Sequence, residues 1–113
     1  MEQQPLFIAE ASSNHGRELA RGLAFVDAAA EAGCDAVKFQ LFKIARMFAP
    51  EILRQSPKHR ARVEWELPLA HLAPLAQRCR ERGIQFSCTP FYLEATLTSR
   101  EVARAKRSTG RWR

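Results

Sequence analysis

The stretch that decides the fold is Asp35-Ala36-Val37-Lys38-Phe39-Gln40, a short apolar run that carries a lysine and a glutamine two residues apart. This composition is typical of a buried β-strand. Because side chains alternate along a strand, Lys38 and Gln40 are expected on one face, and Val37 and Phe39 on the other. A lysine in a buried strand costs free energy unless an anion or a hydrogen-bond acceptor satisfies it. Lys38 therefore indicates either an anion-binding site at the carboxyl end of this strand or a structural ion pair.

The segment before this stretch predicts a strand followed by a helix. Residues 5–11 contain the run Leu-Phe-Ile-Ala, which predicts a first buried strand with Glu10 at its carboxyl end. Apolar residues then recur at helical spacing from residue 18 to residue 32, and Gly33 stands where a glycine commonly ends a helix. A strand, a helix, a tight turn and a second strand form a βαβ unit, which implies parallel strands joined by a right-handed crossover.

The segment after the stretch predicts a second unit of the same kind. Residues 41–67 contain two prolines and mixed charges, which favour a long loop with short helical pieces, and such loops are often part of a binding site. Residues 68–82 predict a helix that Gly83 ends, and Pro74 should kink this helix or delay its start. Residues 84–88 predict a third strand that leads to Thr89. The predicted fold class is α/β with a parallel sheet.

Polar side chains collect at the carboxyl ends of the three predicted strands. They are Glu10, then Lys38 and Gln40, then Thr89. Ligands of parallel α/β folds bind at this edge of the sheet, and an acid, a cation, an amide and a hydroxyl there suit anion binding and acid–base chemistry. The alternative is that Glu10 and Lys38 pair across neighbouring strands and merely neutralise each other. The three histidines show no pair with the spacing of metal ligands, so the sequence predicts no complete metal site.

Composition and charge narrow the classes of protein that this chain can represent. Its 113 residues allow one modest domain. Residues 1–95 hold 12 basic and 11 acidic side chains, whereas residues 96–113 hold 6 basic and 1 acidic, so the net charge of +6 lies mostly in a basic tail. No apolar run approaches the ~20 residues of a membrane span, and the N-terminus lacks a signal-peptide pattern. With three cysteines and no CxxC pair, we expect a cytoplasmic protein that does not enter a membrane.

Three separated motifs resemble the N-terminal signature of the sialic acid synthase family, which contains N-acetylneuraminate synthase. They are Ile8-Ala9-Glu10…Asn14-His15-Gly16, Ala-Gly-Cys-Asp-Ala-Val-Lys-Phe-Gln at residues 32–40, and Cys88-Thr89-Pro90-Phe91. The resemblance implies a (β/α)8 TIM barrel, of which this chain holds an incomplete N-terminal portion of about three βα units. It also implies an enzyme, a transferase that condenses phosphoenolpyruvate with N-acetylmannosamine or a related N-acyl amino sugar in nonulosonic acid biosynthesis.

The same resemblance implies site residues, a cofactor and an oligomeric state. Glu10 is expected beside the reacting centre as the catalytic residue, and the substrate-binding residues are expected to be Lys38 and Thr89 for the phosphate, Gln40 for the sugar, and Asn14 and His15 in the first βα loop. A divalent Mn²⁺ or Mg²⁺ polarises the sugar aldehyde in this family, and we expect its ligands to be absent from this chain. Full-length members are expected to be homodimers.

The sequence departs from the family after residue 95. The family continues with a helix, a fourth strand and later the histidines that bind the metal, and residues 96–113 show no match to that continuation. We therefore predict two parts, an N-terminal barrel portion at residues 1–95 and a basic tail at residues 96–113, and interpret the chain as a truncated, inactive fragment of a broken or frameshifted gene. A related phosphoenolpyruvate-condensing barrel that makes another sugar acid is one alternative. A small binding protein that uses its tail on nucleic acid or acidic partners is another, but Trp112 is the tail's one aromatic residue, so nucleic acid is not the partner that we expect.

Overall fold

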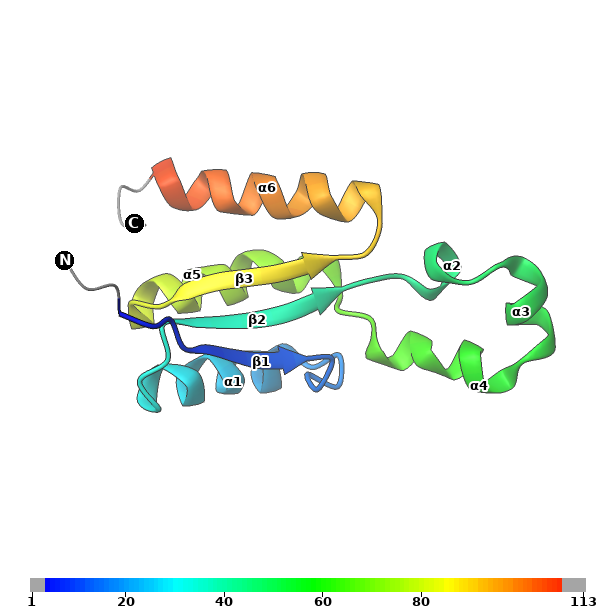
Figure 1. Cartoon of the computed structure of the whole chain (residues 1–113), viewed down its shortest axis with the longest axis horizontal. Helices are drawn as coiled ribbons and strands as arrows, with labels where there is room; N and C mark the ends of the chain where they lie inside the picture. Colours follow the sequence, from blue (N-terminus) through cyan, green and yellow to red (C-terminus); the bar gives the residue numbers. More distant parts are fainter. Residues whose placement is uncertain (1–3, 109–113) are drawn as a thin grey trace.

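The computed structural model describes residues 4–108, with side chains through residue 102, as three parallel strands interleaved with helices (Figure 1). In chain order the elements are β1 (Ile8–Ser12), α1 (Leu19–Glu31), β2 (Ala36–Leu41), α2 (Ile44–Met47), α3 (Pro50–Gln55), α4 (Pro57–Arg60), the 3-10 turns η1 (Ala61–Trp65) and η2 (Leu69–His71), α5 (Leu72–Arg82), β3 (Gln85–Pro90) and α6 (Leu93–Ser108). The predicted α/β class and the predicted order of elements are confirmed.

The three strands form one sheet in the order β1-β2-β3, and both pairings are parallel. Ala36 lies opposite Ile8 on one side and Gln85 on the other, which fixes the register of all three strands at their amino ends. A bulge between Glu10 and Ser12 shifts the register at the carboxyl end of β1. The parallel arrangement confirms the two βα units that the sequence predicted.

One face of the sheet is covered by helices, and this is where the core lies. Figure 1 shows α1 and α5 behind the strands, each running along the sheet. Helices α1 and α5 approach each other closely at Gly22, because a Cβ atom there would lie 3.0 Å from Cδ2 of Leu75. The buried residues of this core come from the sheet, from the helices and from the segments before α5 and β3: Ala11, Val26, Ala29, Val37, Phe39, Leu41, Leu67, Leu72, Leu75, Cys79, Ile84 and Ala95.

Glycines follow the ends of α1 and α5, as predicted. Gly33 has φ +85° and Gly83 has φ +74°, in the left-handed region where glycine has no Cβ penalty. Pro74 lies within the first turn of α5, because residues 69–71 form the separate turn η2 and the α-helix begins only at Leu72. Pro74 therefore delays the start of the helix, and its missing N–H falls where helical N–H groups have no intrahelical partner.

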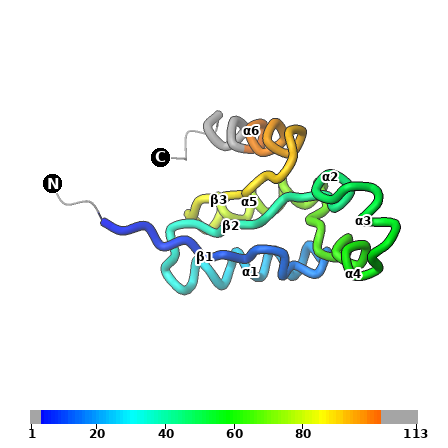
Figure 2. The backbone as a smooth tube through the Cα atoms, turned by 45° about the vertical axis from the view of Figure 1, so that its right-hand side comes forward, coloured from blue at the N-terminus to red at the C-terminus, as the bar shows by residue number. Residues whose placement is uncertain are grey.

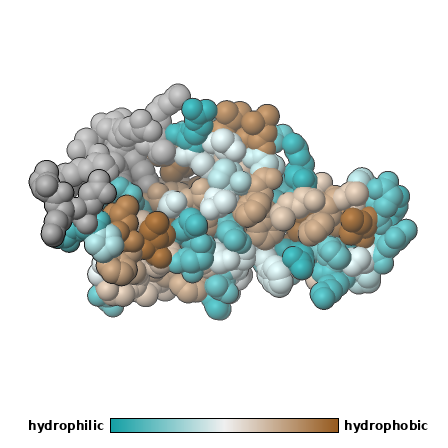
Figure 3. Space-filling view, in the orientation of Figure 1, coloured by the Kyte–Doolittle hydropathy of each residue, from teal (hydrophilic) through white to brown (hydrophobic). Residues whose placement is uncertain are grey.

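Two details of the predicted strands are wrong. Leu6 and Phe7 were expected in a buried first strand, but they precede β1 and are 71% and 62% exposed, since β1 is an edge strand and no described element covers its start. The strand around Lys38 was expected to be fully buried. Lys38 and Gln40 are partly accessible instead, because the described residues leave the second face of the sheet open. Figure 3 shows this side of the molecule as a mixture of apolar and polar surface.

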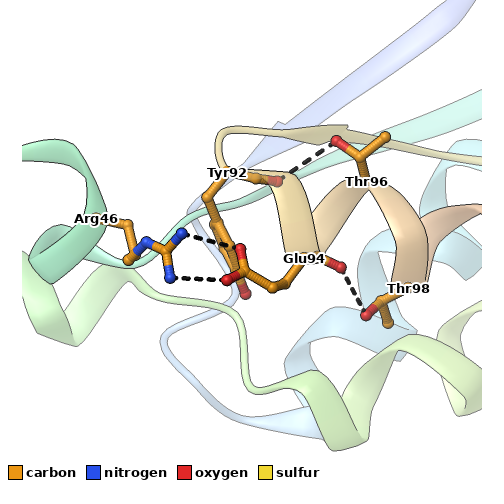
Figure 4. A network of polar contacts seen from close by, with 5 residues as sticks. All are labelled: Arg46, Tyr92, Glu94, Thr96 and Thr98. Atoms are coloured by element: carbon orange, nitrogen blue, oxygen red, sulfur yellow. Dashed lines mark hydrogen bonds and ion pairs between the residues drawn. The ribbon is translucent and has the colours of Figure 1, made fainter.

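Helix α6 runs across residue 95, where we predicted that the family-like part ends. Ala95 is completely buried, and Val102 packs against the same core, so the helix lies along β3 and α5. Its start is tied to α2, because Arg46 donates two hydrogen bonds, of 2.8 and 3.1 Å, to the two carboxylate oxygens of Glu94 (Figure 4). Trp112 lies outside the described residues, and the division of the chain at residue 95 stays a prediction.

The segment between β2 and α5 leaves the carboxyl end of the sheet as an arm of short helices (Figure 2). We call residues 44–67 the insert. The sequence predicted this region as a long loop with short helical pieces, and α2, α3, α4 and η1 confirm it.

None of the helices in the described part of the chain combines the length and the apolar composition needed to cross a membrane.

Candidate functional site at the carboxyl ends of the strands

The structure brings four of the predicted site residues to one face of the sheet. Glu10 lies opposite Lys38 in the β1–β2 pairing, and Gln40 lies opposite Thr89 in the β2–β3 pairing. Because Lys38 and Gln40 are two residues apart on β2, all four side chains share one face. This is the face that α1 and α5 do not cover, towards the carboxyl ends of the strands.

Lys38 and Glu10 form an ion pair on this open face. Lys38 Nζ lies 3.3 Å from Glu10 Oε1, and the two side chains are 37% and 46% exposed. Glu10 also accepts a hydrogen bond from the Ser12 backbone N–H through Oε2, at 3.1 Å. The structural ion pair that the sequence left open is therefore present. Since both groups are accessible to water, the pair contributes at most about 1 kcal/mol, and the ammonium keeps further N–H donors for an anion.

Gln40 is oriented by the loop that follows β1. Its Oε1 atom accepts hydrogen bonds from Ser12 Oγ and Ser13 Oγ, each at 3.1 Å. Ser12 has φ +54°, a left-handed conformation that accompanies the bulge in β1. Because the two hydroxyls use Oε1, the Nε2 amide group is the donor that Gln40 can offer to a ligand.

A pocket of about 520 Å³ lies beside these residues, at the end of β2. Gln40 and Asn14 are the predicted site residues that line it, whereas Lys38 and Thr89 lie outside its wall. The site therefore has two adjoining parts, an ion pair on the open sheet and a pocket, and Gln40 lies on the same face as the ion pair and also lines the pocket. The pocket wall is made of Ser12, Ser13, Asn14, Gln40, Phe42, Ile44, Met47, Phe48, Arg62, Trp65 and Phe91.

Sequence reasoning missed the outer wall of this pocket, which the insert provides. Arg62 lies against two aromatic rings, 5.9 Å from the ring centre of Phe48 and 5.4 Å from that of Trp65. Among the described residues, it is the one charged side chain in the wall of this pocket. The aromatic and basic residues between positions 42 and 65 were the available signal, because a long loop after a parallel strand often contributes to a site. Their sequence spacing alone does not show which of them face inward.

Asn14 and His15 lie in the β1–α1 loop, where the family resemblance placed them. Asn14 Nδ2 donates to the Ala11 carbonyl at 3.1 Å and so closes the turn after β1. His15 is only 1% exposed, and its Nδ1 accepts a hydrogen bond from the Arg17 N–H at 2.9 Å. Burial lowers the pKa of His15, His71 lowers this pKa further, and the backbone of Trp65 partly opposes them. His15 is a buried loop residue and does not line the pocket.

The donors present here do not fit a divalent metal. Within the part of the chain that the structure describes, no three His, Cys, Asp or Glu side chains are grouped closely enough to hold one. Glu10 is occupied by Lys38, and His15 accepts a backbone hydrogen bond with its Nδ1 atom.

Comparison with known proteins identifies the family. The model of the NeuB family matches residues 25–106. This chain belongs to the NeuB family. The spore coat polysaccharide biosynthesis protein SpsE of Bacillus subtilis (strain 168) is 39% identical to it over 93 residues, which cover 75% of this chain and 25% of that protein. The family match extends past residue 95 into α6.

Solved structures show the same relationship in three dimensions. The N-acetylneuraminic acid (sialic acid) synthetase from Leptospira borgpetersenii serovar Hardjo-bovis, in complex with citrate, superposes with a TM-score of 0.76 at 30% identity, over 88% of this chain and 34% of that one. A protein from Chromobacterium violaceum ATCC 12472 shares the fold with a TM-score of 0.73 at 22% identity. The predicted membership in a sialic acid synthase-like family, over its N-terminal part, is confirmed. This NeuB family chain spans about a quarter to a third of these relatives.

Proposed function

We propose that this chain forms the N-terminal part of a (β/α)8 barrel that condenses phosphoenolpyruvate with N-acetylmannosamine or a related N-acyl amino sugar. Membership in the NeuB family supports the proposal, as does the likeness to a sialic acid synthetase structure. A parallel sheet with helices on one face and polar residues on the other is what a portion of such a barrel presents, since the second face lines the barrel interior. The three strands make up three of the eight.

The observation that carries the proposal is the shared position of Lys38, Gln40 and Thr89 on the open face beside the pocket. Lys38 supplies a positive charge and Thr89 a hydroxyl donor, which together suit the phosphate of phosphoenolpyruvate. The pocket next to them receives the sugar, and Gln40 faces both ligands with its amide group. Glu10, 3.3 Å from Lys38, is the carboxylate that we expect beside the reacting centre.

The metal of this family is expected to be held by residues outside this chain, because the described donors do not fit one. Mn²⁺ or Mg²⁺ supplies Lewis-acid polarisation of an aldehyde when it is bound. The groups described here bind and orient, but they are only part of the set that catalysis needs within a fraction of an ångström. We therefore expect the isolated 113-residue chain to bind ligand without turnover. Homodimers remain the expectation for longer members of the family.

The test measures binding of phosphoenolpyruvate to the purified chain by isothermal titration calorimetry. Lys38→Ala removes a charged hydrogen-bond donor and is expected to weaken binding about tenfold or more. Lys58→Ala is the matched control, since Lys58 is an exposed lysine of α4 that does not line the pocket. Equal affinity in the wild type and Lys38→Ala contradicts the phosphate assignment. Phosphate release by the chain alone, in the presence of sugar and Mn²⁺ and abolished by Lys38→Ala, contradicts the expected lack of turnover.

A further inference from the structure

Arg17 in the β1–α1 loop is hydrogen-bonded to the backbone of the insert. Arg17 Nη1 donates to the carbonyl of Val63 at 3.2 Å and to the carbonyl of Glu66 at 2.9 Å. These acceptors lie 46 and 49 residues further along the chain, one before and one after Trp65. The guanidinium therefore bonds to the backbone on both sides of Trp65, next to Arg62 in the pocket wall.

The backbone of Arg17 has an unusual, strained conformation. Arg17 has φ +60°, in the left-handed region that a residue with a long side chain rarely occupies. The buried imidazole of His15 stabilises this conformation, because its Nδ1 accepts the Arg17 N–H at 2.9 Å. Such strain persists only where the surrounding contacts enforce it, and it often accompanies a functional requirement. Here the surrounding contacts are the hydrogen bond to His15 and the two hydrogen bonds to the insert.

The insert carries the connection on to its own first residues. The Glu66 carboxylate accepts the backbone N–H of Ile44 through Oε2, at 2.9 Å. This bond satisfies one of the free N–H groups at the start of α2 and links the last part of the insert to the first. Ile44 is buried and lines the pocket. A chain of contacts thus runs from Arg17 through Glu66 to Ile44.

We propose that Arg17 is a positioning residue that holds the insert against the β1–α1 loop and thereby fixes the pocket wall formed by Ile44, Arg62 and Trp65. Arg17 does not line the pocket, so it acts through the two carbonyls and touches no ligand. That the ligand of this pocket is a sugar rests on the proposed function. That Arg17 holds the insert in place does not depend on the proposed function.

The first test is amide hydrogen exchange of the full chain, measured by mass spectrometry. In Arg17→Ala, exchange across residues 61–67 and at the start of α2 is expected to rise about tenfold or more, because two hydrogen bonds to a charged group are lost. Exchange in β2 is expected to stay unchanged. Arg17→Gly removes the same bonds but relaxes the left-handed backbone, so it should loosen the insert as much without destabilising the sheet. Arg17→Lys can restore one bond and should rescue part of the protection.

The matched control is Arg60→Ala. Arg60 also donates to two carbonyls, those of Leu53 and Arg54, but both lie within the insert. Losing these bonds leaves the insert attached to the β1–α1 loop, so exchange across residues 61–67 should rise much less than in Arg17→Ala. Unchanged exchange there in both Arg17→Ala and Arg17→Gly overturns the proposal. An equal rise in Arg60→Ala, or an equal rise throughout β2, also overturns it.

The second test separates this proposal from the proposed function. In a Trp112→Phe background, fluorescence reports on Trp65, and N-acetylmannosamine or phosphoenolpyruvate is added as the probe. Arg17→Ala is expected to weaken the response to the sugar about tenfold while phosphoenolpyruvate affinity stays unchanged. An equal loss for both probes overturns the assignment of Arg17 to the pocket wall. If the wild type binds neither probe, the proposed function fails, and the exchange measurement alone decides the role of Arg17.

Discussion

The two faces of the sheet differ completely although the same strands form both. On β2, Val37 and Phe39 are at most 1% exposed under the helices, whereas Lys38 and Gln40 remain accessible on the opposite face. Helices from the described chain close the first face. The second face collects polar groups that meet only when the strands pair. Along one strand, residues on the covered face therefore stabilise the fold, whereas their neighbours on the open face are available to a ligand. Substitutions one position apart should affect stability and ligand binding differently.

The largest expected effect is on stability and comes from the covered face. Phe39→Ala removes a fully buried ring that stacks on Phe86 and is expected to lower the free energy of unfolding by about 3–5 kcal/mol. Lys38→Ala, one residue away, removes a half-exposed ion pair and should cost no more than about 1 kcal/mol. Urea unfolding followed by circular dichroism measures both. Comparable losses of unfolding free energy in the two variants mean that the open face contributes to stability as much as the covered face does.

A smaller effect, on thiol reactivity, compares two adjacent residues of β3. Burial raises the pKa of Cys88 to about 11, and a hydrogen bond with Ser99 only partly offsets this. Its thiolate is therefore about 100-fold rarer near neutral pH than that of a thiol with the ordinary pKa. In a Cys34→Ser background, the thiol introduced by Ser87→Cys on the open face should react with a disulfide reagent about 100-fold faster than Cys88. Similar rates at the two positions contradict the assignment of faces.

The part of the fold that could be predicted from the sequence depends on local patterns. Helical spacing between residues 18 and 32, and glycines at positions 33 and 83, act within a few residues, so they mark the helices and their ends without tertiary information. Strand alternation placed Lys38 and Gln40 on one face for the same reason. The pairing of Lys38 with Glu10 was foreseen as one of two alternatives, since parallel neighbours bring strand ends together.

What escaped prediction depends on contacts between distant segments. The exposure of Leu6 and Phe7 reflects their position before an edge strand, which a local apolar run cannot show. Arg17 donates to carbonyls 46 and 49 residues further along the chain, and those acceptors are backbone atoms that carry no sequence signal. In the sequence Arg62 and Trp65 belong to a polar loop, and only the folded chain shows that both line the pocket.

The smallest expected effect is on the pH dependence of stability. It concerns His15, a polar residue that is as buried as the residues of the covered face. Burial, His71 and the nearby arginines lower the pKa of His15 in the folded chain, while the unfolded chain keeps the ordinary value of about 6.5. Between these two values the unfolded state binds more protons, so stability is complete above about pH 6.5 and falls as the pH decreases towards the folded-state pKa. The slope is at most about 1.4 kcal/mol per pH unit for each such histidine.

His15→Asn tests this dependence, because an asparagine oxygen can still accept the Arg17 N–H but does not titrate. Urea midpoints measured from about pH 7.5 to about pH 5.5 should fall less steeply in this variant than in the wild type. Burial and Arg17 also lower the pKa of His71, so His71→Gln should remove a further part of the slope, and the double variant should be the flattest. A wild-type slope that persists in the double variant means that other groups titrate on unfolding. In that case, burial of His15 does not lower its pKa enough to affect stability, whereas burial of Phe39 on the covered face still affects stability.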